Sequence, residues 1–341
     1  MKKVLLLLGG FLLTAASASA IPVKSQHSAA PGKYLTCPIP EGAVKPSKAP
    51  ASRTETSFVY SLAQEPYSPI GFKGSMKGDA VAQALEIPVE ITSSMSGNKL
   101  ESVYFYTGIN TTTQKNRITE ATVFLTYDLE EEPFYSQTVT GLSTQPLMRV
   151  DVQLTTPQTI DGTKPLYVCV KSILTNSRDY PIVVDGVARS EYYGGWVANT
   201  NDGKLVWDNL SQYYGYVCMG ATIKGDNFPV DFVSAGQASV LPVVTAGEPF
   251  SVYLLFNNNG INDVTSLEVE ATVGNEASKV FTVQTEESVP FAATDFVQVD
   301  GLTYSKPGKD ATPIKLKITK VNGNANKSSN TEVETSAIFI A

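Results

Sequence analysis

The fold of this chain is constrained most by a series of short segments in which apolar and polar residues alternate. Clear examples are residues 100–106, 119–127 and 250–257. A period of two places one side of a segment in a core and the other in solvent, which is the pattern of a β-strand. Turns rich in Gly, Asn and Pro, such as Asp185-Gly186, separate these segments. The sequence therefore predicts an all-β protein.

The candidate strands fall into two groups on either side of residues 225–228. Residues 57–225 hold about ten strands and one helical turn at 89–95, which favours a jelly-roll-like β-sandwich. In this group the segment 79–87 is ambiguous, because its residues favour helix while its spacing fits a strand. Residues 226–341 have the strand spacing of an immunoglobulin-like β-sandwich, with candidate strands at 230–233, 250–257, 265–273, 278–285, 294–299, 314–321 and 334–340.

The first 56 residues have the composition of a leader. Residues 1–20 combine Lys2-Lys3, an apolar run and an alanine-rich end, as in a secretory signal peptide. Residues 21–56 are rich in Pro, Ala, Ser and Lys and predict a disordered leader or linker. No later stretch reaches ~18 apolar residues, so no transmembrane segment is predicted. We expect an exported protein, located in the periplasm, at the outer-membrane surface or outside the cell.

Charge and histidine content exclude several functional classes. The formal net charge is -7 at pH 7, whereas binding to nucleic acid or anionic membranes needs clustered Lys and Arg. The single histidine, His27, lies in the leader, which argues against Ser/His or Cys/His nucleophiles and against His-ligated zinc. We therefore expect no enzyme activity, no cofactor, no metal and no nucleic-acid partner.

The stretch 192–225 closes the first group of strands and contains both tryptophans of the chain. Its aromatic residues allow two interpretations. They could form a platform on which a sugar ring stacks, or they could fill the sandwich core and the cross-strand pairs of a hairpin whose loop is 199–203. We favour the core for the tryptophans and partial exposure for the tyrosines. The candidate ligand-binding residues are Trp196, Trp207, Tyr192, Tyr193, Tyr213 and Tyr214.

Three cysteines leave at least one thiol unpaired. Cys37 lies in the leader, while Cys169 and Cys218 each follow a Tyr by two residues in the middle of a predicted strand. If those two strands are neighbours, Cys169 and Cys218 can form a disulfide. Otherwise both are small buried thiols that behave as apolar core residues.

The carboxylates supply no clear catalytic or metal-binding pattern. Glu130-Glu131-Glu132 beside Asp128 could bind calcium, but consecutive side chains cannot all face one site, so a solvated acidic loop is favoured. A glycosidase needs two carboxyl groups that face each other. Candidates such as Glu90, Glu101 and Asp151 carry no spacing that marks such a pair.

Several short motifs resemble secreted and outer-membrane proteins of the Bacteroidota. Residues 69–72 with 97–104, residues 157–162 before Pro165, and Gly195-Trp196 with Trp207 are similar to the N-terminal region of Omp28-type proteins and to jelly-roll adhesin domains. Residues 247–260 and 320–323 resemble the CARDB-type immunoglobulin-like module. Omp28-type chains usually continue into a thioredoxin-like domain with a Cys-x-x-Cys motif, which does not occur in this sequence. The resemblance implies a surface or adhesin-like context without a redox role.

These observations lead to one expected function and two alternatives. We expect a non-catalytic, exported cell-envelope protein that is adhesin-like, or binds a glycan or a surface or host protein, through its first β-sandwich. The first alternative is a structural or assembly subunit of a cell-envelope complex, and the second is a glycan-active enzyme that uses carboxylates alone.

Overall fold

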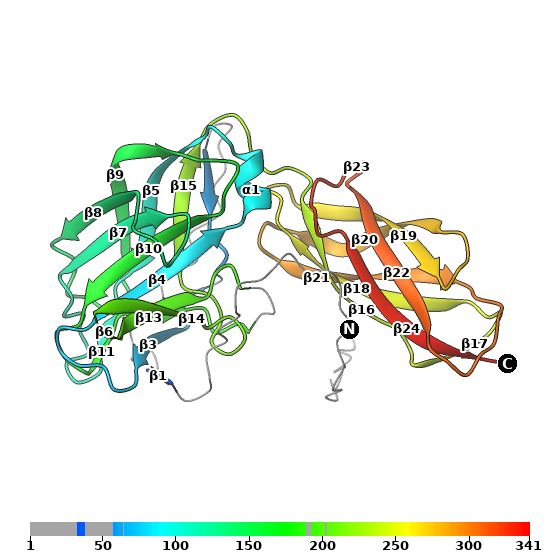
Figure 1. The fold of residues 1–341 in the computed structure, drawn as a ribbon, viewed down its shortest axis with the longest axis horizontal. Helices are drawn as coiled ribbons and strands as arrows, with labels where there is room; N and C mark the ends of the chain where they lie inside the picture. The colour runs from blue at the N-terminus through cyan, green and yellow to red at the C-terminus, as the bar shows by residue number, and fades with distance from the viewer. Residues whose placement is uncertain (1–32, 38–56, 64, 189–191, 202) are drawn as a thin grey trace.

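The computed structural model describes residues 33–37, 57–63, 65–188, 192–201 and 203–341. As predicted, the chain is all-β, and one short helix, α1 (Val89–Ser94), is the only helix in these residues. The strands form two groups of sheets (Figure 1), which we call the first sandwich (β1 to β15) and the second sandwich (β16 to β24). The signal peptide predicted for residues 1–20 lies outside the described residues. No helix among the described residues is long and apolar enough to cross a membrane.

Two larger sheets face each other in the first sandwich. One has six strands in the order β14-β13-β4-β10-β7-β8, and the other has four in the order β2-β15-β5-β9. The strands of the six-stranded sheet are β4 (Ala80–Ile87), β7 (Glu120–Thr126), β8 (Tyr135–Thr140), β10 (Leu166–Ile173), β13 (Trp196–Asn201) and β14 (Lys204–Asn209). Those of the four-stranded sheet are β2 (Ser57–Tyr60), β5 (Lys99–Tyr106), β9 (Arg149–Thr159) and β15 (Met219–Lys224). Their inward side chains form one core cluster that includes Leu85, Val168, Leu100 and Val103.

Strand β4 resolves the ambiguous segment of the sequence. Its residues Ala80, Ala82 and Ala84 favour helix intrinsically, but the segment pairs along its length with β10 and in part with β13. Most of its side chains are buried, and burial between two strands outweighs the small helix preference of alanine. The helical turn expected next is present as α1, which Pro88 precedes.

Two smaller sheets complete the first sandwich. They consist of β1 (Tyr34–Thr36), β3 (Ser68–Phe72) and β12 (Ile182–Val184), and of β6 (Ile109–Asn110) with β11 (Asp179–Tyr180). The prediction of disorder over 21–56 is wrong for residues 33–37. Strand β1 pairs with β3, the buried Tyr34 ring contacts Phe72, and the Tyr34 hydroxyl donates to Asp208 at 2.8 Å. One buried aromatic ring and three backbone pairs order a segment whose composition gives no such signal.

The second sandwich consists of two sheets packed against each other. One has three strands in the order β16-β18-β21, and the other has the order β17-β24-β22-β19-β20. The short β23 pairs with β22 in the second of these sheets. The buried residues of the second sandwich form a separate core cluster that includes Phe256, Leu267, Ile318 and Phe339. The strands are β16 (Val233–Ser239), β17 (Val243–Thr245), β18 (Phe250–Asn258), β19 (Val264–Val273), β20 (Lys279–Val289), β21 (Thr294–Leu302), β22 (Thr312–Val321), β23 (Asn324–Ala325) and β24 (Glu332–Ile340).

The predicted strand at 230–233 is wrong, because β16 begins at Val233, where that strand was expected to end. Asp231 has φ 57, a left-handed conformation that a β-strand cannot contain. The other six strands expected in this half are present, each within a few residues of its predicted position.

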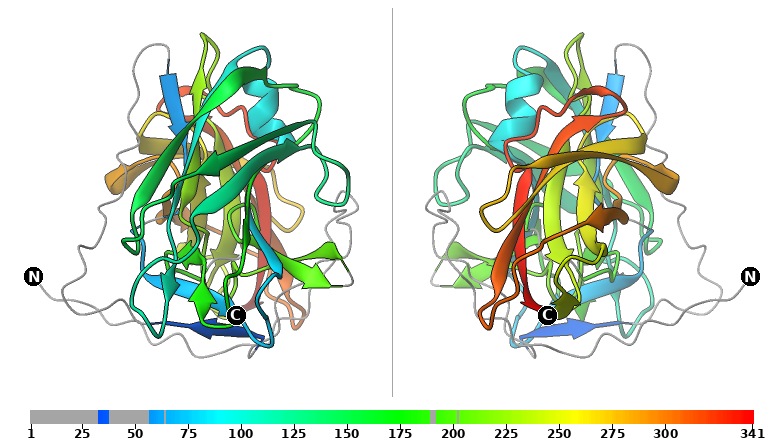
Figure 2. Two further views of the ribbon diagram at one scale, coloured as in Figure 1. Left: turned by 90° about the vertical axis from the view of Figure 1, so that its left-hand side faces the viewer. Right: turned by 90° about the vertical axis from the view of Figure 1, so that its right-hand side faces the viewer.

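The two sandwiches share a cluster of aromatic rings where they meet. Phe291 lies in the loop between β20 and β21, yet its ring packs 5.0 Å from that of Phe58 and 5.7 Å from that of Tyr60, both of β2. Phe228, from the connecting segment, packs 5.9 Å from Phe58. Phe291 and Phe232 belong to the core cluster of the first sandwich. Figure 1 shows the second sandwich beside one end of the first, and the two views of Figure 2, turned by 90°, show one sandwich in front of the other.

Candidate functional site

The outward face of the six-stranded sheet brings the two tryptophans together. Trp196 of β13 pairs with Ala84 of β4, and Ala84 pairs with Cys169 of β10. Trp207 of β14 pairs with Ala198, two residues after Trp196. Because side chains alternate along a strand, all these residues share the face that points away from the core.

We call this surface the aromatic platform. Its floor consists of three buried side chains, Ala84, Phe124 and Cys169, and five partly buried side chains pack against them. The tryptophans are therefore neither core residues of the sandwich, as favoured from the sequence, nor fully exposed. The partly buried side chains of the platform are Leu129, Tyr167, Trp196, Leu205 and Trp207.

A carboxyl group, that of Glu86, lies at one side of the platform and is held by two aromatic donors. The indole Nε1–H of Trp196 donates to Glu86 Oε2 at 2.9 Å, and the Tyr167 hydroxyl also hydrogen-bonds to Glu86. Burial raises the pKa of Glu86 to about 7, although both hydrogen bonds act to lower it, and the charge of Glu90 raises it further. Near neutral pH the carboxyl group is thus present in both its charged and its neutral form.

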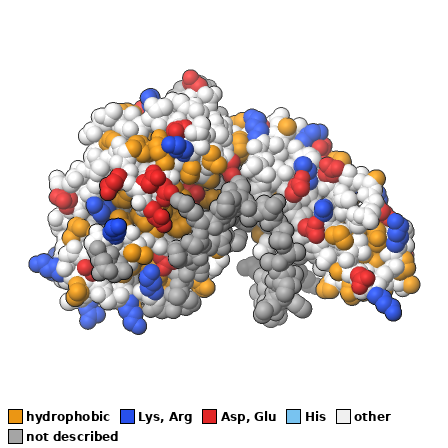
Figure 3. Space-filling model, viewed as in Figure 1, with side chains coloured by type: hydrophobic (Ala, Val, Ile, Leu, Met, Phe, Trp, Pro, Cys, Tyr) orange, Lys and Arg blue, Asp and Glu red, His pale blue; other side chains and the backbone are white. Residues whose placement is uncertain are grey.

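An acidic loop lies next to the platform. Leu129, in the loop between β7 and β8, packs into the platform, which places Asp128 and Glu130 at its side. The Glu130 and Glu131 backbone amides donate to Asp128 and shape the loop into a turn. Figure 3 shows hydrophobic side chains with acidic side chains among them over the area of β4, β7 and β10. The side chains of Glu130, Glu131 and Glu132 are exposed, as a solvated acidic loop requires.

Of the four predicted tyrosines, none belongs to the platform. The Tyr192 hydroxyl accepts from Gln212 Nε2 at 2.7 Å, and Tyr213 is exposed. Tyr214 packs against the core of the first sandwich, with its ring 5.8 Å from that of Tyr34. Tyr193 packs against the same core and lines a small hollow where the two sandwiches meet. The predicted hairpin between β13 and β14 is present, but its loop is shorter than the predicted 199–203, because Asn199 and Thr200 pair with Val206 and Leu205 within the hairpin.

Sequence reasoning missed Glu86, Tyr167 and Phe124 as members of the site. The sequence feature that could have indicated Glu86 is the alternating series Ala80, Ala82, Ala84 and Glu86, which lies on one side of β4. That side becomes a surface only through pairing with β10 and β13, and the pairing could not be read from the local pattern.

The disulfide that the sequence allowed between Cys169 and Cys218 is not formed. Both residues, and Cys37, are buried thiols outside any disulfide. Cys169 lies in β10 and points outward under the platform, while Cys218 directly precedes β15 in the four-stranded sheet and belongs to the core. Strands β10 and β15 are not neighbours in a sheet. A disulfide between Cys169 and Cys218 is therefore not possible in this fold, and both residues are buried thiols. Burial raises the pKa of the Cys169 thiol well above its ordinary value.

The carboxylates named from the sequence are dispersed. Lys224 Nζ lies 2.6 Å from Glu101 Oε2, and the Ser329 hydroxyl donates to Glu90 at 3.4 Å, across the contact between the sandwiches. Arg149 binds Asp151 through Nε and Nη2. No group of three or more His, Cys, Asp or Glu suited to a metal ion occurs in the described part of the chain.

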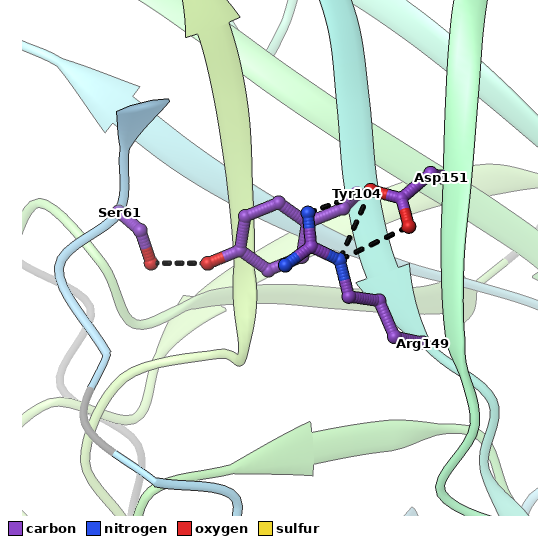
Figure 4. Close-up of polar contacts among 4 residues, drawn as sticks. All are labelled: Ser61, Tyr104, Arg149 and Asp151. Atoms are coloured by element: carbon purple, nitrogen blue, oxygen red, sulfur yellow. Dashed lines mark hydrogen bonds and ion pairs between the residues drawn. The ribbon is translucent and has the colours of Figure 1, made fainter. Parts of the chain in front are cut away.

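Asp151 belongs to a polar network on the four-stranded sheet (Figure 4). The Arg149 guanidinium, paired with Asp151, lies over the Tyr104 ring at 4.0 Å from its centroid. At the far end of that ring, the Tyr104 hydroxyl donates to Ser61 Oγ at 2.6 Å, and Ser61 donates to the Met219 carbonyl. Burial raises the pKa of Tyr104 to about 12. Every polar group in the network has a partner within it or on the backbone, which is the mark of a structural cluster.

A cleft of about 650 Å³ lies where the sandwiches meet. It is open, and its walls mix polar and apolar side chains, including Ser93, Ser96, Asp226, Phe232 and Lys327. The two charged residues of its lining, Asp226 and Lys327, are both exposed. The platform, in contrast, combines aromatic surface with a partly buried carboxyl group, so it is the stronger candidate site.

Comparison with known proteins adds little to this geometry. No family model matches the chain, and no curated protein matches it; the Omp28-type resemblance therefore gains no support. A CARDB domain from Pyrococcus furiosus, solved with di-metal ions, is 16% identical over 33% of this chain and 94% of its own length, with a TM-score of 0.23.

Two larger proteins match across more of the chain. Red sea bream transglutaminase is 10% identical over 91% of this chain (TM-score 0.25), and Bacteroides uniformis beta-glucuronidase is 8% identical over 76% of it (TM-score 0.23). This chain covers only 31% and 26% of those two proteins. At these TM-scores none of the similarities supports an inference about activity or ligand.

Proposed function

We propose that this chain is an exported, non-catalytic binding protein of the cell envelope whose aromatic platform binds a carbohydrate. The observation that carries the proposal is the placement of Trp196, Trp207 and Tyr167 on one outward sheet face, with the carboxyl group of Glu86 held at one side of it by Trp196 and Tyr167. The C–H face of a sugar ring packs well on aromatic rings, and a fixed polar group at the rim orients its hydroxyls.

The state of Glu86 supports binding over catalysis. A general acid must deliver its proton to the bond that it cleaves and needs a second carboxylate across the substrate. Glu86 instead accepts hydrogen bonds from Trp196 and Tyr167, which fix it as a hydrogen-bond acceptor. Its free lone pairs suit a sugar hydroxyl at the edge of the platform.

Binding to an array of oligosaccharides, followed by calorimetry with those retained, tests this proposal. Trp196→Ala and Trp207→Ala should each weaken binding by about tenfold or more, since each removes a ring on which the sugar packs. Tyr253→Ala is the matched control, because Tyr253 is an exposed aromatic residue (43%) of the second sandwich. Circular dichroism establishes that each variant is folded. Absence of binding to any oligosaccharide, or equal losses in the control, would refute the proposal.

One observation favours the assembly-subunit alternative. Leu241, Val243 and Ile340 are 72%, 49% and 48% exposed and lie near one another, because β17 pairs with β24. An apolar group of this kind suits a protein contact. Light scattering after gel filtration, and pull-down from envelope fractions with wild type and Leu241→Ser, would distinguish this function: a stoichiometric partner lost in the variant supports it.

A further inference from the structure

Residues 33–37, which we call the edge segment, lie on the first sandwich outside its two larger sheets. Strand β1 within this segment pairs with β3 at the edge of the sheet β1-β3-β12 (Figure 1). Backbone hydrogen bonds hold both ends of the segment. The Lys73 N–H donates to the Lys33 carbonyl at 3.1 Å, and the Cys37 N–H donates to the Pro69 carbonyl at 3.0 Å.

The first two side chains of the edge segment bind one buried carboxylate. Lys33 Nζ lies 2.8 Å from Asp208 Oδ2, and the Tyr34 hydroxyl donates to the same oxygen at 2.8 Å. The Asp208 side chain is only 9% exposed, so the segment supplies a cation and a hydroxyl to a charge that has little contact with water. The Tyr34 ring packs 5.3 Å from that of Phe72 and 5.8 Å from that of Tyr214. The surface under the segment therefore suits an aromatic residue that follows a basic one.

The last residue of the edge segment makes a second contact with the first sandwich. Cys37 is buried and forms a cluster with Ile109 and Tyr180, and the Ser68 hydroxyl donates to the Cys37 carbonyl at 3.2 Å. The two residues between Tyr34 and Cys37 are exposed. The surface thus recognises a Lys-Tyr pair and a small residue shortly after it, and it places little demand on the residues between them.

None of these contacts requires that the edge segment and the surface under it belong to one chain. A strand edge binds an extended peptide through main-chain hydrogen bonds, and side-chain pockets add specificity. Residues 38–56 connect the edge segment to β2, and a chain of that length can span up to about 60 Å. The segment of one copy can therefore reach the surface of a neighbouring copy. A second copy carries the same segment and the same surface, so an exchange in both directions keeps every contact.

We propose that the edge of β3, together with Asp208, is a binding site for the edge segment of a second copy of this chain. Two copies exchange their edge segments and form a closed dimer in which Lys33 and Tyr34 of each copy bind Asp208 of the other. This inference goes beyond the proposed function, because it does not depend on the aromatic platform or on a ligand of the platform. A connection of this length gives the segment of the same chain an effective concentration of the order of 1 mM, so the wild type exchanges near that protein concentration and is monomeric at about 10 µM.

Two complementary variants of the whole chain test the exchange. Tyr34→Ala impairs the edge segment and leaves the site intact, whereas Asp208→Asn impairs the site and leaves the segment intact. Each change weakens binding of the segment within its own chain by about tenfold or more, because it removes a buried ring or a buried ion pair. This loss offsets the advantage of the same chain at about 0.1 mM protein. In an equimolar mixture, the intact segment of Asp208→Asn binds the intact site of Tyr34→Ala.

Sedimentation velocity and native mass spectrometry measure the result, under reducing conditions so that Cys37 cannot link two copies. At about 0.1 mM protein we expect a heterodimer in the mixture, with about tenfold more dimer than in either variant alone. Asp208→Asn mixed with Tyr253→Ala is the control, since Tyr253 is an exposed residue of the second sandwich and that chain keeps its own edge segment in place. Circular dichroism establishes that each variant is folded.

Folded variants that stay monomeric in the mixture would overturn the inference. Equal amounts of dimer in the control mixture, or in Tyr34→Ala alone, would locate the contact elsewhere on the surface and overturn it as well.

A labelled peptide of residues 33–37 replaces Asp208→Asn if that variant does not fold. A segment that is bound at an effective concentration of about 1 mM has a Kd below that value, so the peptide should bind Tyr34→Ala at about 1 mM. The same peptide with alanine in place of its tyrosine should not bind, and equal behaviour of the two peptides would refute the exchange. Tyr34→Phe, which loses only the hydroxyl, takes the place of Tyr34→Ala if the latter does not fold.

Discussion

Substitution of Glu86 by glutamine should stabilise the protein above neutral pH and leave its stability unchanged in acid. Burial raises the pKa of Glu86 from its ordinary 4.5 to about 7, so the folded state prefers the neutral carboxyl group. Between these two pH values the folded protein binds more protons than the unfolded chain. The free energy of unfolding of the wild type therefore decreases as the pH rises through this window.

The size of the effect follows from the two pKa values. They differ by about 2.5, and each pKa unit corresponds to about 1.4 kcal/mol, which sets an upper limit of about 3.5 kcal/mol. Glu86 is partly exposed, and solvent screening reduces this figure, so we expect about 1–3 kcal/mol. Glutamine is neutral at every pH, has nearly the same shape, and keeps an oxygen that accepts from the Trp196 indole N–H.

Urea unfolding of both proteins at about pH 4.5 and about pH 8.5 measures the effect. Far-ultraviolet circular dichroism follows the sheets, and tryptophan fluorescence follows the platform, since both tryptophans of the chain lie there. Glu131→Gln, at an exposed position outside the hydrogen-bonded pair, should show no comparable dependence. An equal difference between Glu86→Gln and wild type at both pH values, or a less stable variant at high pH, would show that Glu86 is ionised and compensated in the folded state.

Three further predictions concern packing. Gly220→Ala should lower the free energy of unfolding by several kcal/mol, because a Cβ there would come within 2.4 Å of the Tyr104 ring. Gly308→Ala is the control, since nothing lies within 4 Å of a Cβ at that position. Denaturant unfolding measures both variants, and equal stability of the two would contradict the prediction. Phe291→Ala should cost about 3–5 kcal/mol and separate the unfolding of the two sandwiches into two calorimetric transitions; one unchanged transition would contradict the role given to this ring. The three thiols, all buried, should react with a thiol reagent only in denaturant, and rapid reaction of the native protein would disagree with their burial.

Local patterns predicted the strands well and their neighbours poorly. Alternation located β5, β18 and β19 to within a residue or two, because each buries one side in the core nearest to it. The platform, in contrast, arises from the pairing of β4 with β13, whose residues are more than 100 positions apart. Nothing near Trp196 in the sequence indicates Glu86, and nothing near Cys169 shows that it faces away from Cys218. Long-range pairing is decided by the packing of the whole sandwich, which a local pattern does not contain.

The aromatic rings shared by the two sandwiches have a consequence for any attempt to divide the chain. A cut at residues 225–228 would follow the connection between the two sets of sheets, but Phe291 and Phe232 would leave with the second piece while their packing partners stayed with the first. The first piece would then expose Phe58 and Tyr60, and the second would expose the loop that holds Phe291. Each fragment would carry a new apolar surface that the whole protein never presents. Self-association of such fragments would therefore result from this new apolar surface and would not show that either sandwich self-associates in the whole protein.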